Sequence, residues 1–470
     1  MTPWLQAAGW SAALLPLSYA AANPLARRQT SSTTATVNLA DQIGTPEHLA
    51  AGFLYGIPDT ANQVPSYFYT QMGFQGTRAG GSQLPAPARG WVYGENEFQN
   101  RFDSALSNYK TARQYDGTFQ ILVADLWGAD GTNHSIPMPG DNGDFSSYDA
   151  FLTALIDNIN SNDMLPGLIY DLWNEPDGGN FWTASEDQFL QTWGRTHARI
   201  KGAFPDLDII GPSSASQPSS SNTWLTNFYN FVKPNGSIPD IYSWHEETNG
   251  DQVDRDVAAQ HALESSMGLP NNPININEYG TLQEQQPAAT AWYISQLERV
   301  GVRGLRGNWA SSYSLHDYFA GLLGKPGANT DEDLQEGEAT GYWPNSEWLV
   351  YQYYNLNMTG ERLSTTASGD GSWDVYATYD KSSGRVKMLC GARLTSGTFY
   401  ITVENLSSLG LPTSGTIDIL TYHFDWSNNQ FEDNPSPDNQ GYYGHSYSGN
   451  SLTFYIGATE TLAYAFEFSV

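Results

Sequence analysis

Cysteine and positive charge are both scarce in this chain of 470 residues. Its one cysteine, Cys390, cannot form an intramolecular disulfide, and we expect it to be a small buried residue. The 21 lysines and arginines face 50 acidic residues, which gives a net charge of -29. Because nucleic acids and anionic membranes are bound by basic patches, this balance argues against both as partners.

Motifs for several other chemistries are missing as well. No group of Cys and His has the spacing of metal ligands, and no glycine-rich phosphate loop follows a predicted strand. The serine-rich "GPSSAS" follows a predicted strand but lacks the Gly-x-Ser-x-Gly pattern of serine hydrolases. We therefore expect no metal and no organic cofactor.

The N-terminus has the features of an export signal. The apolar run "WLQAAGWSAALLPLSYAAA" is too short for a comfortable membrane span and predicts a signal peptide over residues 1–22. Residues 23–28 end in Arg27 and Arg28, a dibasic processing site as in fungal secreted proteins. Residues 29–45 form a leader in which "ATVNLA" is expected to add a strand to a C-terminal sheet. Four sequons add weak support for the secretory route: Asn133, Asn235, Asn357 and Asn405. We expect a secreted, extracellular protein.

Two domains follow the leader. Over residues 46–358, short apolar runs alternate with helical patterns, which is typical of parallel βα units. The eight expected strands are "AAGFLYG", "FQGTRAG", "FQILVADLWG", "GLIYDLWNE", "DIIGPS", "DIYSWHEE", "ININEYG" and "GLRGNWA". Eight such units predict a (β/α)8 TIM barrel of the α/β class. Over residues 359–470, alternating strands separated by polar turns predict an all-β sandwich.

Two short motifs place acids at the ends of predicted strands. "YDLWNEPD" ends the fourth strand with Glu175, and "NINEYG" ends the seventh with Glu278. Side chains at the C-terminal ends of barrel strands face one active-site mouth. Retaining glycosidases need two carboxyls about 5–5.5 Å apart, one as acid/base and one as nucleophile. Asn174 adds an amide for a sugar hydroxyl, and we expect Pro176 to turn Glu175 towards the pocket.

The pairing of "WNEP" with "NEYG" resembles clan A of the glycoside hydrolases, which are retaining enzymes on (β/α)8 barrels. Within the clan, the chain is most similar to family 39, the β-xylosidase and α-iduronidase family. That similarity is carried by "MGFQGTRAGG", "DIYSWHEE", "HDYFAGLLG" and the C-terminal β-domain, and it covers nearly the whole mature chain. The resemblance implies that Glu175 is the acid/base and Glu278 the nucleophile.

The resemblance also implies roles around the two acids. Asn174 would bind the 2-hydroxyl of the reacting sugar, and Arg78 would hold the nucleophile ionised. His245 matches a pocket histidine, or it is a buried structural residue, and Trp309 would form the floor of the sugar site. Further aromatic residues either line sugar sites or pack the core: Trp127, Trp182, Trp244, Trp343 and Tyr313. The residues that we expect to bind the substrate are Arg78, Asn174, His245, Trp309, Glu247 and Trp127.

The chain departs from the family pattern at two places that would touch the sugar. Ala79 and Gly80 replace a His-Gly pair, and Glu247 replaces an aromatic residue. Glu247 and its neighbour Glu246 are either solvated acids on the rim of the pocket or groups that bind sugar hydroxyls.

These observations favour a retaining glycoside hydrolase that cleaves a plant-type or microbial polysaccharide or oligosaccharide. Two alternatives stay open. A polysaccharide lyase on the same barrel would need Arg78 or His245 to neutralise a uronic acid. A carbohydrate-binding protein would have kept the barrel and lost catalysis, although both acids are present.

Overall fold

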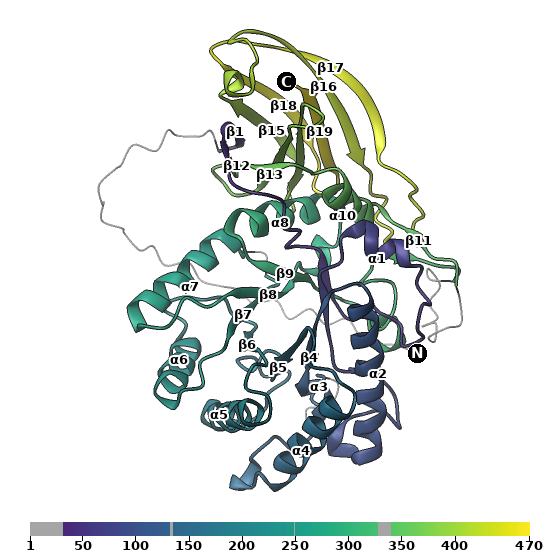
Figure 1. Ribbon diagram of the computed structural model, residues 1–470, viewed down its shortest axis with the longest axis vertical. Coiled ribbons are helices and arrows are strands. Elements are labelled where there is room, and N and C mark those ends of the chain that lie inside the picture. The colour runs from purple at the N-terminus through teal and green to yellow at the C-terminus, as the bar shows by residue number, and fades with distance from the viewer. Residues whose placement is uncertain (1–31, 132–134, 249, 328–339) are drawn as a thin grey trace, which may run out of the picture.

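The protein consists of a barrel and a β-sheet domain, which Figure 1 shows one above the other. The computed structural model describes residues 32–131, 135–248, 250–327 and 340–470. The predicted signal peptide, the Arg27–Arg28 site and the Asn133 sequon lie outside these residues. In the described ranges, no helix is both long enough and apolar enough to cross a membrane.

Eight parallel strands close the barrel, which confirms the predicted fold class. They are β2 (Gly52–Leu54), β3 (Gly76–Ala79), β4 (Thr118–Leu122), β5 (Leu168–Asp171), β6 (Ile209–Ser214), β7 (Ile241–Glu246), β8 (Ile274–Tyr279) and β9 (Arg303–Arg306). Each overlaps one of the eight apolar runs expected to form strands, and β4, β6 and β9 extend one residue beyond their runs. The ring closes where Phe53 of β2 pairs with Arg306 of β9. The strands are buried on both faces because helices cover the barrel, so they show no polar alternation.

Helices surround this barrel (Figure 1). The longer ones are α1 (Ser66–Met72), α2 (Glu95–Gln114), α4 (Ser146–Ser161), α5 (Glu186–Ala203), α6 (Thr223–Asn235), α7 (Val253–Met267), α8 (Pro287–Val300) and α10 (Ser346–Leu356). Short helices α3 (Val123–Trp127) and α9 (Ser312–Leu315) and the strands β10 (Leu323–Gly324) and β11 (Trp343–Pro344) lie in the connections. α5 begins at Ser185, whose side chain accepts a hydrogen bond from the Gln188 amide at 3.2 Å. This N-cap satisfies an otherwise unpaired donor of the first turn.

The second domain is a nine-stranded sheet in the order β17-β16-β19-β14-β13-β12-β1-β15-β18. Its strands are β1 (Thr34–Gln42), β12 (Glu361–Thr366), β13 (Trp373–Asp380), β14 (Arg385–Ala392), β15 (Gly397–Glu404), β16 (Gly415–Phe424), β17 (Asp438–Tyr447), β18 (Ser451–Ala458) and β19 (Ala463–Ser469). The two halves of this sheet enclose a second apolar core, which includes Cys390. β1 comes from the leader and pairs with β12 and β15.

Helix α8 joins the two domains. Its residue Ala288 approaches β14 so closely that a Cβ on Gly391 would lie 1.8 Å from the Ala288 carbonyl oxygen. Gln296 of α8 donates a hydrogen bond to Asp374 of β13 at 2.7 Å, and Arg299 forms an ion pair with the same carboxylate. A buried carboxylate that is paired and hydrogen-bonded in this way fixes the orientation of the two domains.

Candidate active site

A cavity of about 530 Å³ opens at the C-terminal ends of the barrel strands. Its lining comes from the ends of β2, β4, β5, β7, β8 and β9. The lining residues are Leu54, Tyr55, Ser82, Gln83, Leu122, Asp125, Asp130, Asn174, Glu175, Asn180, Phe181, Glu247, Glu278, Asn308, Trp309, Ala310, Ser311 and Leu315. The size and the mixed lining are those of a small-molecule site.

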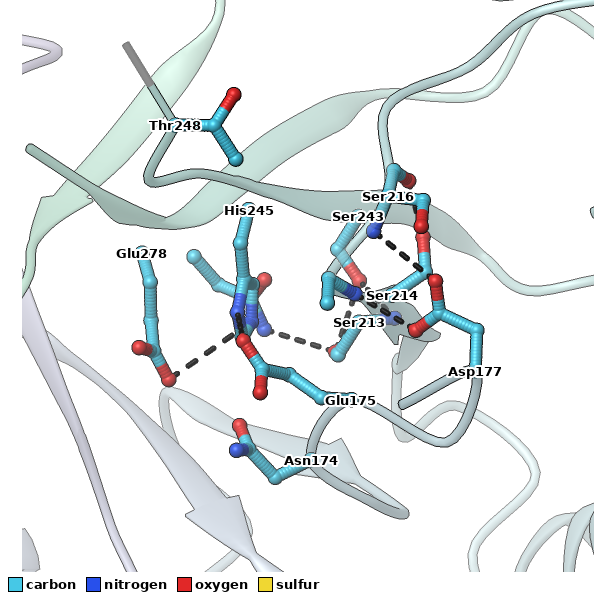
Figure 2. Close-up of polar contacts among 12 residues, drawn as sticks. Asn174, Glu175, Asp177, Ser213, Ser214, Ser216, Ser243, His245, Thr248 and Glu278 are labelled. Atoms are coloured by element: carbon cyan, nitrogen blue, oxygen red, sulfur yellow. Dashed lines mark hydrogen bonds and ion pairs between the residues drawn. The ribbon is translucent and has the colours of Figure 1, made fainter. Parts of the chain in front are cut away.

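The two predicted acids face this cavity from opposite sides of one histidine. His245 of β7 places Nδ1 3.0 Å from Glu175 Oε1 and Nε2 3.7 Å from Glu278 Oε1. Figure 2 shows the imidazole between the two carboxyls, with Asn174 below Glu175. The structure therefore brings together Glu175, which follows the end of β5, and Glu278 of β8, as a barrel requires for side chains at its mouth.

Glu175 is held in a left-handed backbone conformation with φ of +44°. Few residues other than glycine adopt this region, and such strain gathers at functional sites. The following residue, Pro176, disfavours the right-handed helical conformation at Glu175. The Gly178 amide donates to the Glu175 carbonyl oxygen at 3.0 Å, so Pro176 occupies the second position of a β-turn that begins at the strained Glu175.

The loop after Glu175 is anchored to the end of β6. The Glu175 amide donates to the Ser213 carbonyl oxygen at 2.9 Å. The Asp177 carboxylate accepts hydrogen bonds from the amides of Ala215 at 2.8 Å and Ser216 at 3.0 Å (Figure 2). These bonds hold the acid in its strained conformation.

Arg78 of β3 lies beneath the cavity and is fully buried. Its Nε donates to Asp171 Oδ2 at 2.6 Å, its Nη1 donates to Asn174 Oδ1 at 2.8 Å, and Nη1 also contacts Glu278. Burial disfavours its charge, but Asp171 and Glu278 outweigh burial and raise the pKa of Arg78. A permanent positive charge therefore lies against the Glu278 carboxylate.

Asp171 and Asn277 complete this buried floor and were missed by our sequence analysis. Asn277 Nδ2 donates to Asp171 Oδ2 at 3.0 Å and to Ser213 Oγ at 2.8 Å. Both are polar residues inside strands that are otherwise apolar and buried. That pattern in the sequence could have identified them as site residues. Their bonds fix the carboxylate that holds Arg78.

His245 is fully buried, like Arg78, so neither side chain has exposed surface for a sugar. This differs from the substrate-binding role that we expected for both. Burial alone would lower the pKa of His245, but Glu278 and the hydrogen bond to Glu175 raise it. Burial would raise the pKa of Glu175, but His245 lowers it. His245 Nδ1 and Glu175 Oε1 are joined by a 3.0 Å hydrogen bond, so the two groups titrate as a pair.

The two adjacent acids after the β7 histidine point in opposite directions. Glu246 is buried behind the strand, where Trp244 Nε1 donates to its Oε1 at 2.7 Å. Glu247 is half-buried and lines the cavity. Glu246 is therefore neither a solvated rim acid nor a group that binds sugar.

The predicted aromatic residues separate into two groups. Trp309 is 46% exposed, lines the cavity and is fixed by a hydrogen bond from Nε1 to the Gly280 carbonyl oxygen at 3.0 Å. Trp127 is 2% exposed and packs edge-on against Tyr148 and Phe151. Its position in the core corrects the expectation that it binds sugar. Trp182 and Trp244 are also buried, and neither Trp343 nor Tyr313 lines the cavity.

A second carboxyl cluster at the cavity was not predicted. Asp125 and Asp130 line its wall, and the Tyr55 hydroxyl hydrogen-bonds to Asp125. Burial, with Asp130 nearby, raises the pKa of Asp125 to about 7. Both acids follow the apolar run of β4, which is the signal that identified Glu175 and Glu278. Ala79 and Gly80, expected to touch the sugar, are buried beside this wall and do not line it.

Among the residues that the structure describes, two groups of side chains have donor atoms close enough to hold a metal ion. They are Glu175, His245 and Glu247 in the cavity, and Glu246, Asp251 and Asp256 behind β7. In the first group, His245 and Glu175 already use their facing atoms in a hydrogen bond to each other. That group therefore suits proton transfer better than metal binding.

Comparison with known proteins supports the fold. No family model matches the chain. The curated β-xylosidase of Geobacillus stearothermophilus is 24% identical over 171 residues, or 31% of this chain, and the chain matches about a third (32%) of that relative's length. Protein N2152 of Neocallimastix frontalis has a similar structure, with a TM-score of 0.73 and 22% identity over 93% of this chain and 99% of that one. The family 39 enzyme of Xanthomonas axonopodis pv. citri gives a TM-score of 0.55 and 12% identity over 95% of this chain and 100% of its own. This chain has the fold of the clan A glycoside hydrolases. Family 39 is among its structural neighbours.

Proposed function

We propose that this chain is a secreted retaining glycoside hydrolase acting on a plant-type or microbial polysaccharide or oligosaccharide. The observation that carries the proposal is the pair of carboxyls, Glu175 and Glu278, which face one cavity on two sides of His245. Secretion is supported by the apolar N-terminal run and the dibasic pair that follows it.

In the first step, a Glu278 oxygen attacks the anomeric carbon while the bond to the leaving oxygen breaks. Glu175 transfers its proton to that oxygen, and a glycosyl ester forms on Glu278. In the second step, Glu175 takes a proton from water, the water oxygen attacks the anomeric carbon, and the Glu278 carboxylate leaves. Each assisted proton transfer contributes about 10²–10⁴-fold to the rate.

The surroundings of the acids fit this sequence of events. Arg78 supplies positive charge to Glu278, and His245 forms a hydrogen bond with Glu175, which must deliver a proton. Trp309 offers an aromatic face to a sugar ring. Because a relative is named a β-xylosidase, a β-xyloside is the first substrate to test.

The lyase alternative is disfavoured by the charges of the cavity. A lyase must neutralise the carboxylate of a uronic acid, yet Arg78 is buried and already bound by Asp171, Asn174 and Glu278. The described residues that line the cavity include five acids and no lysine or arginine. A uronic acid would therefore meet like charge in this site.

The deciding experiment is incubation of the purified protein with aryl glycosides and with plant and microbial polysaccharides. Products are followed by mass and by ultraviolet absorbance. Saturated sugars are expected. Unsaturated products that absorb in the ultraviolet would assign the protein to the lyases, and binding without any product would favour a carbohydrate-binding protein.

A further inference from the structure

A third carboxyl, that of Glu247, lies beside the two proposed catalytic acids. It follows the end of β7, where successive side chains alternate between the interior of the barrel and its outside. Glu246 therefore turns behind the strand and Glu247 turns into the cavity. The resemblance to family 39 led us to expect an aromatic residue at this place.

The contacts of Glu247 fix its carboxyl against the nucleophile. It lies within hydrogen-bonding reach of the Glu278 carboxyl. One of its oxygens lies within 4.8 Å of the facing atoms of Glu175 and His245. Its Oε1 fills the space next to Gly307, where an added Cβ would lie 2.6 Å from that oxygen. Glycine at position 307 thus leaves room for this carboxyl.

A hydrogen bond between two carboxyl groups requires one proton, because an ionised carboxylate can only accept. The Glu278 carboxylate already forms an ion pair with the Arg78 guanidinium, so we assign the proton to Glu247. Burial, followed by the charges of Glu278 and Glu175, raises the pKa of Glu247 well above its ordinary value. Arg78 opposes this shift but does not cancel it.

We propose that Glu247 is a positioning residue that stays protonated and donates a hydrogen bond to the nucleophile Glu278. A buried carboxylic acid kept neutral so that it can donate is a known device of active sites. Here it would hold Glu278 in place for attack and stabilise its carboxylate when that carboxylate leaves in the second step. This inference rests on the proposed hydrolase function.

The charged and titratable groups that face Glu247 come from four elements. They are Arg78 of β3, Glu175 after β5, His245 of β7 and Glu278 of β8. When rising pH ionises Glu247, a second negative charge appears beside Glu278 and the donor is lost. Activity should then fall, because Glu278 is no longer held in position for attack.

The test compares Glu247→Gln with Glu247→Ala and uses Glu246→Gln as the matched control. A dinitrophenyl glycoside of a cleaved sugar serves as substrate, because its departure does not need a proton from Glu175. Glutamine keeps a donor, so Glu247→Gln should retain kcat/KM within about threefold, whereas Glu247→Ala should lose about 10–100-fold, the effect of a hydrogen bond to a charged group. The alkaline limb of the profile of kcat/KM against pH should move up by about one pH unit in Glu247→Gln. Glu246→Gln should leave that limb unchanged.

A second measurement does not depend on turnover. The pKa of Glu247 is raised in the folded state, so ionisation of the unfolded chain above about pH 4.5 lowers the stability of the wild type. Tm should therefore fall less between pH 4.5 and 8 in Glu247→Gln than in the wild type.

An alkaline limb and a pH dependence of Tm that both match the wild type in Glu247→Gln would overturn the inference. So would a loss in Glu247→Gln as large as in Glu247→Ala, because an ionised carboxylate would then be the required group. Neither result would contradict the proposed hydrolase function, which is tested separately by whether the wild type releases saturated products.

Discussion

His245 Nδ1 lies 3.0 Å from Glu175 Oε1, while the other nitrogen of the same ring lies 3.7 Å from Glu278 Oε1. One buried imidazole therefore couples the proposed acid/base to the proposed nucleophile. Its charge lowers the pKa of Glu175, although an acid catalyst must be protonated when it acts. The hydrogen bond between the two resolves this, since the proton needs to move only from one partner to the other.

Replacement of Glu278 and replacement of Glu175 should reduce the rate in different ways as the leaving group of the substrate changes. Glu278→Ala should abolish turnover of every substrate, because no covalent intermediate can form. Glu175→Ala should lose about 10²–10⁴-fold on substrates with poor leaving groups and far less on dinitrophenyl glycosides. Steady-state rates on a series of aryl glycosides measure this. If both variants kept wild-type rates on a natural glycan, the assignment of the two acids would be wrong.

His245→Gln should lower the stability of the folded protein most at the pH values where the wild-type imidazole is charged. The pKa of His245 is raised in the folded state, so its contribution is fully present below about pH 6.5 and is lost as pH rises through the folded value. The difference in Tm between wild type and His245→Gln should therefore be largest below pH 6.5 and shrink above it. A difference that is constant from pH 5 to 9 would contradict a charged His245.

Arg78→Met should destabilise the barrel strongly, because it leaves Asp171 and Glu278 buried without their partner. Removing one member of a buried ion pair costs about 3–5 kcal/mol in the free energy of unfolding. Urea unfolding measures this cost. The double variant Arg78→Met with Asp171→Asn should recover part of it, since one unpaired charge is gone. No recovery would show that Asp171 is not the main partner of Arg78.

Trp309 and Trp127 form a matched pair that separates sugar binding from packing. Trp309→Ala removes an exposed side chain of the cavity, so it should raise KM and leave Tm nearly unchanged. Trp127→Ala empties a buried site and should cost about 3–5 kcal/mol in the free energy of unfolding. Kinetics on an oligosaccharide and thermal unfolding compare the two. Equal effects on KM and Tm in both variants would refute the separation.

Positions of elements were predictable where the local pattern is strong. The eight barrel strands are apolar runs because they are buried on both faces, and helix α4 buries the apolar face that its sequence spacing predicts. Strand β17 has no such pattern, because its sequence "DNQGYYGHSY" is polar and mostly exposed and shows no alternation. It is a strand because it pairs with β16, and the local sequence pattern does not reveal that pairing.

The sequence by itself determined the barrel and the placement of Glu175 and Glu278 at its mouth. Both follow from local patterns, because strand ends in a parallel barrel all point to one side. Only the tertiary structure decided that Trp127 packs in the core, that Arg78 and His245 lie under the cavity, and that Glu247 rather than Glu246 faces Glu278. Those outcomes depend on which neighbours surround a side chain. Burial and the charges of neighbours from other strands then set its protonation and its role.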